Sequence, residues 1–396
     1  MNPHLLDLAA RGLSGASLVW VLLAFVLASQ LTILSVTLYL HRCQAHRAVD
    51  FHPAVAHLFR FWAWFTTAMV TKEWAAIHRK HHAAVETEED PHSPVVHGMK
   101  EVVLHGVVLY QRACKDRAMI EKYGAGCPDD WIERNLYARY PALGPTLLLF
   151  TMLALCGAVG LAWWALMMLV IPVAAAGGIN GLGHGVGYRN FETSDCSTNL
   201  TPWAFLLGGE ELHNNHHAFP SSARFAMRRF EFDIGWVVLR LLQRVGLAKI
   251  LRVAPKLSLR PEVALPDAET VRALITYRFS VLSSYFSEVT KPAFKAETVG
   301  KPVALSRRLR RALSSDGRWL DQAARERLAS WVAERPLMTK VIEHRRRLAA
   351  LLERSGKSSE EMIAALREWC RDAEASGIES LRRYAERLRG YALAPA

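Results

Sequence analysis

The chain has 396 residues, of which 51% are hydrophobic and only 22% charged, and its mean hydropathy is +0.07. This composition excludes a disordered chain and a collagen-like repeat. The six cysteines are scattered without a Cys-x-x-Cys pair, which favours a reducing compartment over a disulfide scaffold. The formal charge of +12 suits a membrane surface or nucleic acid. The sequence contains no nucleic-acid-binding motif, so we expect no nucleic-acid partner.

The apolar residues are concentrated in a few long segments. Residues 17–40 contain no charge and are long enough to cross a bilayer. Residues 142–160 and 161–180 form a second uncharged stretch, which we expect to be a helical hairpin that turns within 157–161. Residues 53–70 are shorter and carry charge, so we expect them to lie at the membrane interface without crossing.

Histidines recur in clusters beside these segments. The clusters are His41 and His46, then His78, His81 and His82, and finally His213, His216 and His217, while His184 stands alone. In the pattern His-x-x-His-His, all three imidazoles share one face of a helix. Asn180 and His184 share a face for the same reason. His41 and His46 are five residues apart, so we expect them to straddle a helix end.

Nine histidines at these spacings are enough for two metal sites with about four ligands each, and imidazole suits zinc, copper, iron or nickel. The alternative for a single cluster is a set of ordinary buried histidines. The recurrence of the pattern favours metal ligation. The other seven histidines, His92 among them, are interpreted as structural or surface residues.

The clusters can share one site only if they lie on one side of the membrane. This requires an even number of crossings between His46 and His78, so residues 53–70 should not cross, and two crossings by residues 142–180 before His184. The count is then three spans with the N-terminus outside. Basic residues gather near the histidines, at Arg42, Arg47, Lys72, Arg79 and Lys80. By the positive-inside rule, we expect a multi-pass protein of the cytoplasmic (inner) membrane with its metal site and C-terminus in the cytoplasm.

The C-terminal third is polar and rich in Ala, Leu and Arg. Helical periodicity covers 303–333, 337–354 and 359–391. We therefore predict a membrane domain over 1–256 and a soluble helical extension over 257–396, to which the sequence assigns no role.

The histidine boxes and their neighbours resemble, in order and spacing, integral-membrane acyl desaturases of the stearoyl-CoA (delta-9) type, especially bacterial members. The matching neighbours are Glu73-Trp74 before the second box, Glu86-Thr87 and Asp90-Pro91-His92 after it, Gly187-Tyr188-Arg189 after His184, and Gly209-Glu210 before the third box. The resemblance covers roughly residues 20–256.

This resemblance implies an all-α membrane bundle of about three spans and an interfacial helix, with a cytosolic helical cap that carries a di-iron site. The nine clustered histidines would be the catalytic metal ligands, and Asn180 would hold a water on one iron. Glu73, Asp90, Arg189 and Glu210 are candidates for orienting the imidazoles. The implied enzyme is an oxidoreductase that uses O2 and two electrons to insert a cis double bond, at delta-9, in unsaturated fatty acid synthesis. Removal of hydrogen from an unactivated methylene requires a redox-active metal. Zinc has no redox chemistry, so the reaction also favours iron.

The acyl carrier stays open between acyl-CoA and phospholipid. Eukaryotic acyl-CoA enzymes have an Arg-Asp pair where this chain has Ala76 and Ile77. Arg112, Lys115 and Arg117 are candidates for contacting the phosphates of either carrier. The sequence contains no haem-binding or Cys-x-x-Cys motif, so we expect electrons from a separate protein that docks on the basic cytosolic face.

Two other functions remain as alternatives. A membrane hydroxylase or ketolase of the same histidine-box superfamily would share the ligands, but not the flanking residues quoted above. A non-enzymatic membrane metal carrier would place its ligands along a pathway within the spans. Here the ligands follow the ends of the spans.

Overall fold

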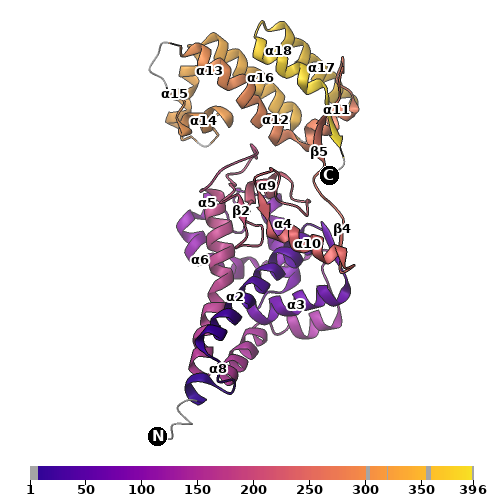
Figure 1. Cartoon of the computed structure of the whole chain (residues 1–396). Helices are drawn as coiled ribbons and strands as arrows, with labels where there is room; N and C mark the ends of the chain where they lie inside the picture. Colours follow the sequence, from indigo (N-terminus) through magenta and orange to yellow (C-terminus); the bar gives the residue numbers. More distant parts are fainter. Residues whose placement is uncertain (1–7, 300–303, 319, 354–357, 395–396) are drawn as a thin grey trace. The chain divides into compact units, whose positions relative to one another are not determined.

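The computed structural model describes residues 8–299, 304–318, 320–353 and 358–394. The chain forms two compact units, one of Met1–Arg189 with Asp195–Ala254 and one of Asn190–Ser194 with Pro255–Ala396 (Figure 1). The second unit therefore begins two residues before the predicted position and also takes a short loop from between His184 and the third box. Both units are built mostly of helices, which confirms the predicted all-α class.

Two helices of the first unit are long and apolar enough to cross a membrane, Leu18–Ala45 and Leu143–His184. The first consists of α2 (Leu18–Leu34) and the π-helical η1 (Ser35–Ala45). The second consists of α8 (Leu143–Ile171), the π-helical η3 (Pro172–Gly181) and the short η4 (Leu182–His184). Each of them ends at histidines of the predicted site.

The second apolar helix folds back on itself at Gly157. This glycine has φ +58°, and a Cβ there would lie 2.5 Å from the carbonyl oxygen of Ala9, so only glycine fits without strain. Trp164 Nε1 donates to the carbonyl of Pro145 at 2.8 Å. In a straight helix, residues 19 positions apart would be separated by about 28 Å. The expected hairpin is therefore present, and its turn lies within the predicted 157–161.

The segment between the two apolar helices packs against them. α3 (Pro53–Thr67) is not among the helices long enough to span, as expected. Its Trp64 donates to the carbonyl of Tyr140 at 3.2 Å, just before α8. The chain continues through α4 (Thr71–Ala83), α5 (Pro94–His97), α6 (Met99–Ala113), α7 (Arg117–Tyr123) and η2 (Glu133–Tyr137).

After the hairpin, a largely irregular segment leads to α9 (His213–Ala218) and α10 (Ile234–Arg244). Two short strand pairs occur here, of which the parallel one lies within this region and the antiparallel one joins it to the segment after the first histidine box. The parallel pair is β2 (Trp203–Ala204) with β3 (Phe232–Asp233), and the antiparallel pair is β1 (Val49–Phe51) with β4 (Ala248–Ile250).

A buried ion pair joins the first histidine box to the start of α10. Arg42 and Asp233 have fully buried side chains, with two nitrogen–oxygen distances of 2.9 and 3.1 Å. Arg42 also donates to the carbonyl of Ala223 and lies over the ring of Phe225. The end of the first apolar helix is thereby held against the segment that follows the third box.

The second unit is a helical domain with its own core. Its helices are α11 (Ala268–Thr276), α12 (Arg278–Tyr285), η5 (Phe286–Thr290), α13 (Lys291–Glu297), α14 (Arg307–Ser314), α15 (Gln322–Ala333), α16 (Pro336–Leu352), α17 (Ser359–Ala375) and α18 (Glu379–Arg389). Tyr285, Trp369 and Tyr384 form the aromatic centre of the core. Strand β5 (Lys256–Leu259) pairs with β6 (Tyr391–Ala394), so the two ends of this unit meet.

The helical periodicity expected in the tail is found, although in shorter pieces. α17 begins at Ser359, as predicted, and a capping box between Ser358 and Glu361 precedes it. The predicted segment ends at 303 and 354, together with residue 319, lie outside the described residues.

Candidate metal centre

The clustered histidines come from four separate segments of the first unit. The second box lies in α4, where the i, i+3, i+4 spacing places His78, His81 and His82 on one face, as expected. The third box makes up most of the six-residue α9. His41 and Asn180 lie in π-helical turns, which are frequent at functional sites, and His46 directly follows the last residue of η1, so the first box straddles a helix end as expected.

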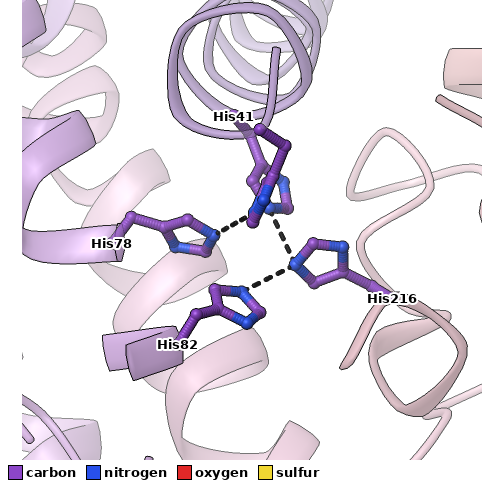
Figure 2. Close-up of side chains that lie close together, drawn as sticks. His41, His78, His82 and His216 are labelled. Atoms are coloured by element: carbon purple, nitrogen blue, oxygen red, sulfur yellow. Dashed lines mark hydrogen bonds between the residues drawn. The ribbon is translucent and has the colours of Figure 1, made fainter. Parts of the chain in front are cut away.

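The nine clustered histidines gather into two groups. Within each group, the ring nitrogens that could bind a metal all lie within 4.8 Å of one another. One group has five members, His41, His46, His78, His82 and His216, and the other has four, His81, His184, His213 and His217. Figure 2 shows four members of the first group pointing toward one another, two of them, His78 and His82, from α4. The sequence predicted which histidines converge, but not this division into five and four.

The closest approaches within each group join Nε2 atoms. In the five-membered group, His216 Nε2 lies 3.0 Å from His41 Nε2 and 2.9 Å from His82 Nε2, and the distance from His46 to His78 is 2.8 Å. In the four-membered group, the Nε2 atoms of His184 and His213 are 3.0 Å apart.

These distances fit metal ligation better than hydrogen bonding among the rings. A neutral imidazole has one N–H, so His216 Nε2 can donate to only one of the two nitrogens that face it. His41 Nδ1 donates its hydrogen to the carboxylate of Glu210, so the Nε2 atom of His41 carries a lone pair and no hydrogen. His217 Nε2 is buried without a hydrogen-bond partner. Ligands about 2.1 Å from a common ion and at right angles would lie about 3 Å apart, so the residues present fit two metal ions.

Carboxylates on the outer ring nitrogens complete the arrangement. His41 Nδ1 is 2.7 Å from Glu210, and His81 Nδ1 is 2.9 Å from both oxygens of Asp90. A carboxylate on Nδ1 fixes the tautomer that offers Nε2 to a metal. Glu210 and Asp90 thus occupy the place that the sequence analysis gave them.

Two further carboxylates also contact the Nδ1 atoms of clustered histidines, a role that was not predicted for them from the sequence. Asp195 lies 2.9 Å from Nδ1 of His217, and Glu86 lies 3.3 Å from Nδ1 of His184. Glu86 was visible only as one of the residues after the second box. Asp195 lies in an irregular segment where no periodicity marks it.

The other two predicted orienting residues act elsewhere. Glu73 accepts a hydrogen bond from Arg117 at 2.9 Å instead of holding an imidazole. Arg189 donates to the main-chain oxygens of Asp195 and Ser197, and so supports the loop that carries Asp195. The neighbour of Glu73, Trp74, stacks on the ring of His78 at 5.0 Å between centroids.

His92 is more closely involved than its interpretation as an ordinary histidine suggested. It is buried, its ring stacks on His81 at 4.5 Å, and its Nε2 has no hydrogen-bond partner. With His81 and Asp90 it forms a third close set of potential ligand atoms. It lies outside the groups of five and four.

Burial keeps six of these imidazoles neutral at pH 7. It is the main cause that lowers the pKa well below 6.5 for His46, His78, His82, His213 and His216. Burial also lowers the pKa of His217, and the nearby Asp195 carboxylate limits the shift, so that the pKa is about 4. The neutral ring is the form that binds a metal.

We expect Asp195→Asn to weaken metal binding by about 10- to 100-fold, because the amide no longer attracts the Nδ1 proton of His217 as a carboxylate does. The measurement is metal content after dialysis against a graded series of chelator concentrations. Asp372→Asn is the matched control, since Asp372 pairs with Arg347 on the second unit. Equal metal retention in the two variants would contradict a role for Asp195.

An apolar cavity reaches the metal centre. Its walls come from α3, α4, α6 and the second half of the hairpin, with Met167, Ile171 and Val102 among the lining side chains. At the histidines it is bounded by His41, His78, His213, Asn180 and Glu210. Asn180 lines the same cavity as His213 of the four-membered group, and its water-holding role stays a prediction. An apolar space bounded in part by candidate metal ligands suits a long alkyl chain.

Comparison with known proteins agrees with this geometry. The sequence profile of the family described as fatty acid desaturase matches residues 17–231. The chain is 30% identical over 227 residues to an sn-1 stearoyl-lipid 9-desaturase of Synechocystis, covering 56% of this chain and 69% of the relative. It is also 30% identical over 227 residues to Delta-9 acyl-lipid desaturase 2 of Arabidopsis thaliana, covering 56% and 71%. An icosanoyl-CoA 5-desaturase of Limnanthes douglasii is 32% identical over 222 residues, covering 54% and 60%.

Proposed function

The chain belongs to the fatty acid desaturase family, and we propose that its two histidine groups hold a di-iron centre that converts a long saturated acyl chain into a cis monounsaturated one. The observation that carries this proposal is the convergence of nine histidines, six of them buried and three half-buried, beside an apolar cavity that three of them line. Iron is favoured because the four- and five-imidazole sets suit it and zinc has no redox chemistry.

The iron ions, once bound, would supply the oxidising power to remove a hydrogen atom from each of two adjacent methylenes. The overall reaction consumes O2, two electrons and two protons and gives the alkene and two waters. The residues of this chain hold and orient the groups involved. Glu210, Asp90, Asp195 and Glu86 fix the imidazoles, and Asn180 would hold a water at the four-histidine group. The cavity walls exclude bulk water and position the chain, which determines the carbon that reacts. The delta-9 position is proposed from the relatives' names.

We place the protein in the cytoplasmic membrane with three crossings. The family and the two apolar helices indicate membrane association. Since both apolar helices end at one metal centre, an even number of crossings must separate those ends, and the hairpin at Gly157 provides two. Arg47, Lys72, Arg79 and Lys80 favour a cytoplasmic site. Arg42 contributes less to this argument than the sequence suggested, because it is paired with Asp233 inside the protein.

The electron donor is proposed to be a separate protein, because the sequence has no haem-binding or Cys-x-x-Cys motif. Exposed basic side chains such as Arg47 and Lys122 would suit an acidic carrier.

The direct test is fatty acid analysis of a desaturase-deficient host that expresses the wild type or His81→Ala. Methyl esters from cells fed labelled stearate would be separated by gas chromatography. A new monounsaturated product in the wild type alone would support the proposal. A hydroxylated or oxidised chain would favour the hydroxylase or ketolase alternative. Metal bound without any change in lipids, even with a suitable reductase supplied, would favour a carrier.

We also propose that the second unit has no part in holding the metal. All nine histidines, Asn180 and the four carboxylates lie in the first unit. We therefore expect deletion of 255–396 to leave the metal content of the folded, membrane-inserted protein unchanged, as measured by elemental analysis. Loss of iron from a truncated chain that is still folded would contradict this division of the chain.

A further inference from the structure

The acyl cavity has an opening on its side, at α6. Every residue that lines the cavity lies in the described part of the chain, and of these Val107 alone is exposed, with 43% of its surface accessible. The other lining side chains, including those at the histidines, are buried or half-buried. Val107 is therefore the part of the cavity wall that is most accessible from outside the protein.

This opening lies along the membrane hairpin. A Cβ on Gly106 would lie 2.4 Å from the Cβ of Ala176, and a Cβ on Gly181 would lie 2.6 Å from Val103. These contacts place α6 directly against η3, in antiparallel order. One turn beyond Gly106 in α6 is Tyr110, and one turn before Ala176 is Pro172; both line the cavity. The mouth is thus bordered on one side by a helix that we expect to lie in the bilayer.

The surface around the mouth is apolar. Leu104 and Val108 flank Val107 on α6 and are 62% and 50% exposed, and Val173 of η3 is 66% exposed. Such a continuous set of exposed aliphatic side chains is costly in water and is typical of a surface that meets lipid. A polar edge on the same helix is formed by the exposed pair of Glu101 and His105. This is the distribution of an interfacial helix.

Basic side chains stand at the end of α6. Arg112, Lys115 and Arg117 are exposed, where phospholipid headgroups would lie if the aliphatic stripe were in lipid. By contrast, Ala76 and Ile77 of α4 are buried in a small apolar cluster with Met119 and Ile120. That part of α4 therefore offers no polar group to a nucleotide.

We propose that the stripe formed by Leu104, Val107 and Val108 is a lateral mouth through which the acyl chain of a membrane glycerolipid enters the cavity directly from the bilayer. The inference rests on the proposed desaturase function and names its substrate as an acyl-lipid. The ester and headgroup stay at the interface beside the basic end of α6, while the alkyl chain slides past Val107 toward the histidines.

The test is photo-crosslinking of the full chain in vesicles of phosphatidylcholine and phosphatidylglycerol whose sn-1 chain carries a diazirine at its midpoint. We expect crosslinks to residues that line the cavity. Val107→Trp should reduce their yield by about tenfold, because the indole fills the mouth. Leu104→Glu lies outside the cavity lining and should reduce the yield by about fivefold, because a carboxylate disfavours contact with lipid. Leu265→Glu is the matched control, since Leu265 is 58% exposed on the second unit.

A stearoyl-CoA analogue with the same diazirine gives the opposing outcome. The proposal is overturned if this analogue labels the cavity while the lipid probe does not, or if neither mouth variant, with normal metal content, lowers the lipid crosslink below that of Leu265→Glu. The crosslink needs no electron donor and no turnover. A monounsaturated product in the fatty acid analysis without a Val107-dependent crosslink would therefore contradict only the proposed lateral mouth. A Val107-dependent crosslink without any product would instead contradict the proposed desaturase function.

Discussion

His216→Ala is expected to lower desaturation at least about 1000-fold and to remove about one of the two metal ions from each chain. The Nε2 atom of His216 lies within 3.0 Å of the ligand nitrogens of both His41 and His82, and its side chain is fully buried. Its removal takes one nitrogen donor from the group of five. Iron content by elemental analysis and product by gas chromatography would measure the two effects.

His344→Ala is the matched control for that variant. His344 is also a buried histidine, but it lies on α16 of the second unit, where its Nδ1 is 2.9 Å from the carbonyl oxygen of Lys340. Its loss should cost about 1–3 kcal/mol of stability and leave the metal content unchanged. An active His216→Ala enzyme with two metal ions would remove His216 from the ligand set.

Asp233→Ala is expected to destabilise the first unit by about 3–5 kcal/mol, because it leaves the guanidinium of Arg42 buried without a counter-charge. Both side chains are fully buried. Asp233 also accepts hydrogen bonds from the main chain of Phe225 and Trp236. The same change should lower metal occupancy, because Arg42 follows His41 directly and Phe225 contacts the ring of His216.

The second unit offers a matched control that differs in burial. Asp267, like Asp233, caps a helix and pairs with an arginine, with nitrogen–oxygen distances of 2.7 and 2.8 Å to Arg260. This pair is partly exposed, so Asp267→Ala should cost only about 1–2 kcal/mol.

Thermal unfolding of the detergent-solubilised protein would compare the two variants, and the difference should appear as several degrees in Tm, up to about 10 °C. The double variant Arg42→Leu with Asp233→Leu should recover part of the loss, because it removes the unpaired charge. If Asp233→Ala and Asp267→Ala lowered Tm equally, burial of the Arg42–Asp233 pair would not contribute to its effect on stability.

Regular local patterns account for what could be predicted of the fold. Uncharged stretches long enough to span a bilayer identified both apolar helices, and a turn was expected within the second because the uncharged run is too long for one crossing. The i, i+3, i+4 spacing put His78, His81 and His82 on one face of α4, because 3.6 residues make one helical turn. The change to a polar composition after the third box indicated a second unit, and the structure begins it at Pro255.

The arrangement of the candidate site was only partly predictable. Asp90 and Glu210 were visible because each stands close to a histidine box. Asp195 and Glu86 contact histidines that are 22 and 98 residues away in the chain, and no local pattern records such a contact. Glu73 shows the opposite case, since it stands beside the second box but is held by Arg117 of α7.

The sequence by itself determined which segments are apolar helices, which nine histidines gather at their ends, and to which family the chain belongs, since all of these depend on residue type and short spacing. Only the tertiary structure decided how the nine divide into five and four, which carboxylates hold them, and that the cavity opens at Val107. Those features depend on which side chains meet across segments far apart in sequence. Such meetings are set by the packing of whole helices, as in the contact of Gly106 with Ala176, and the order of residues within one segment does not contain them.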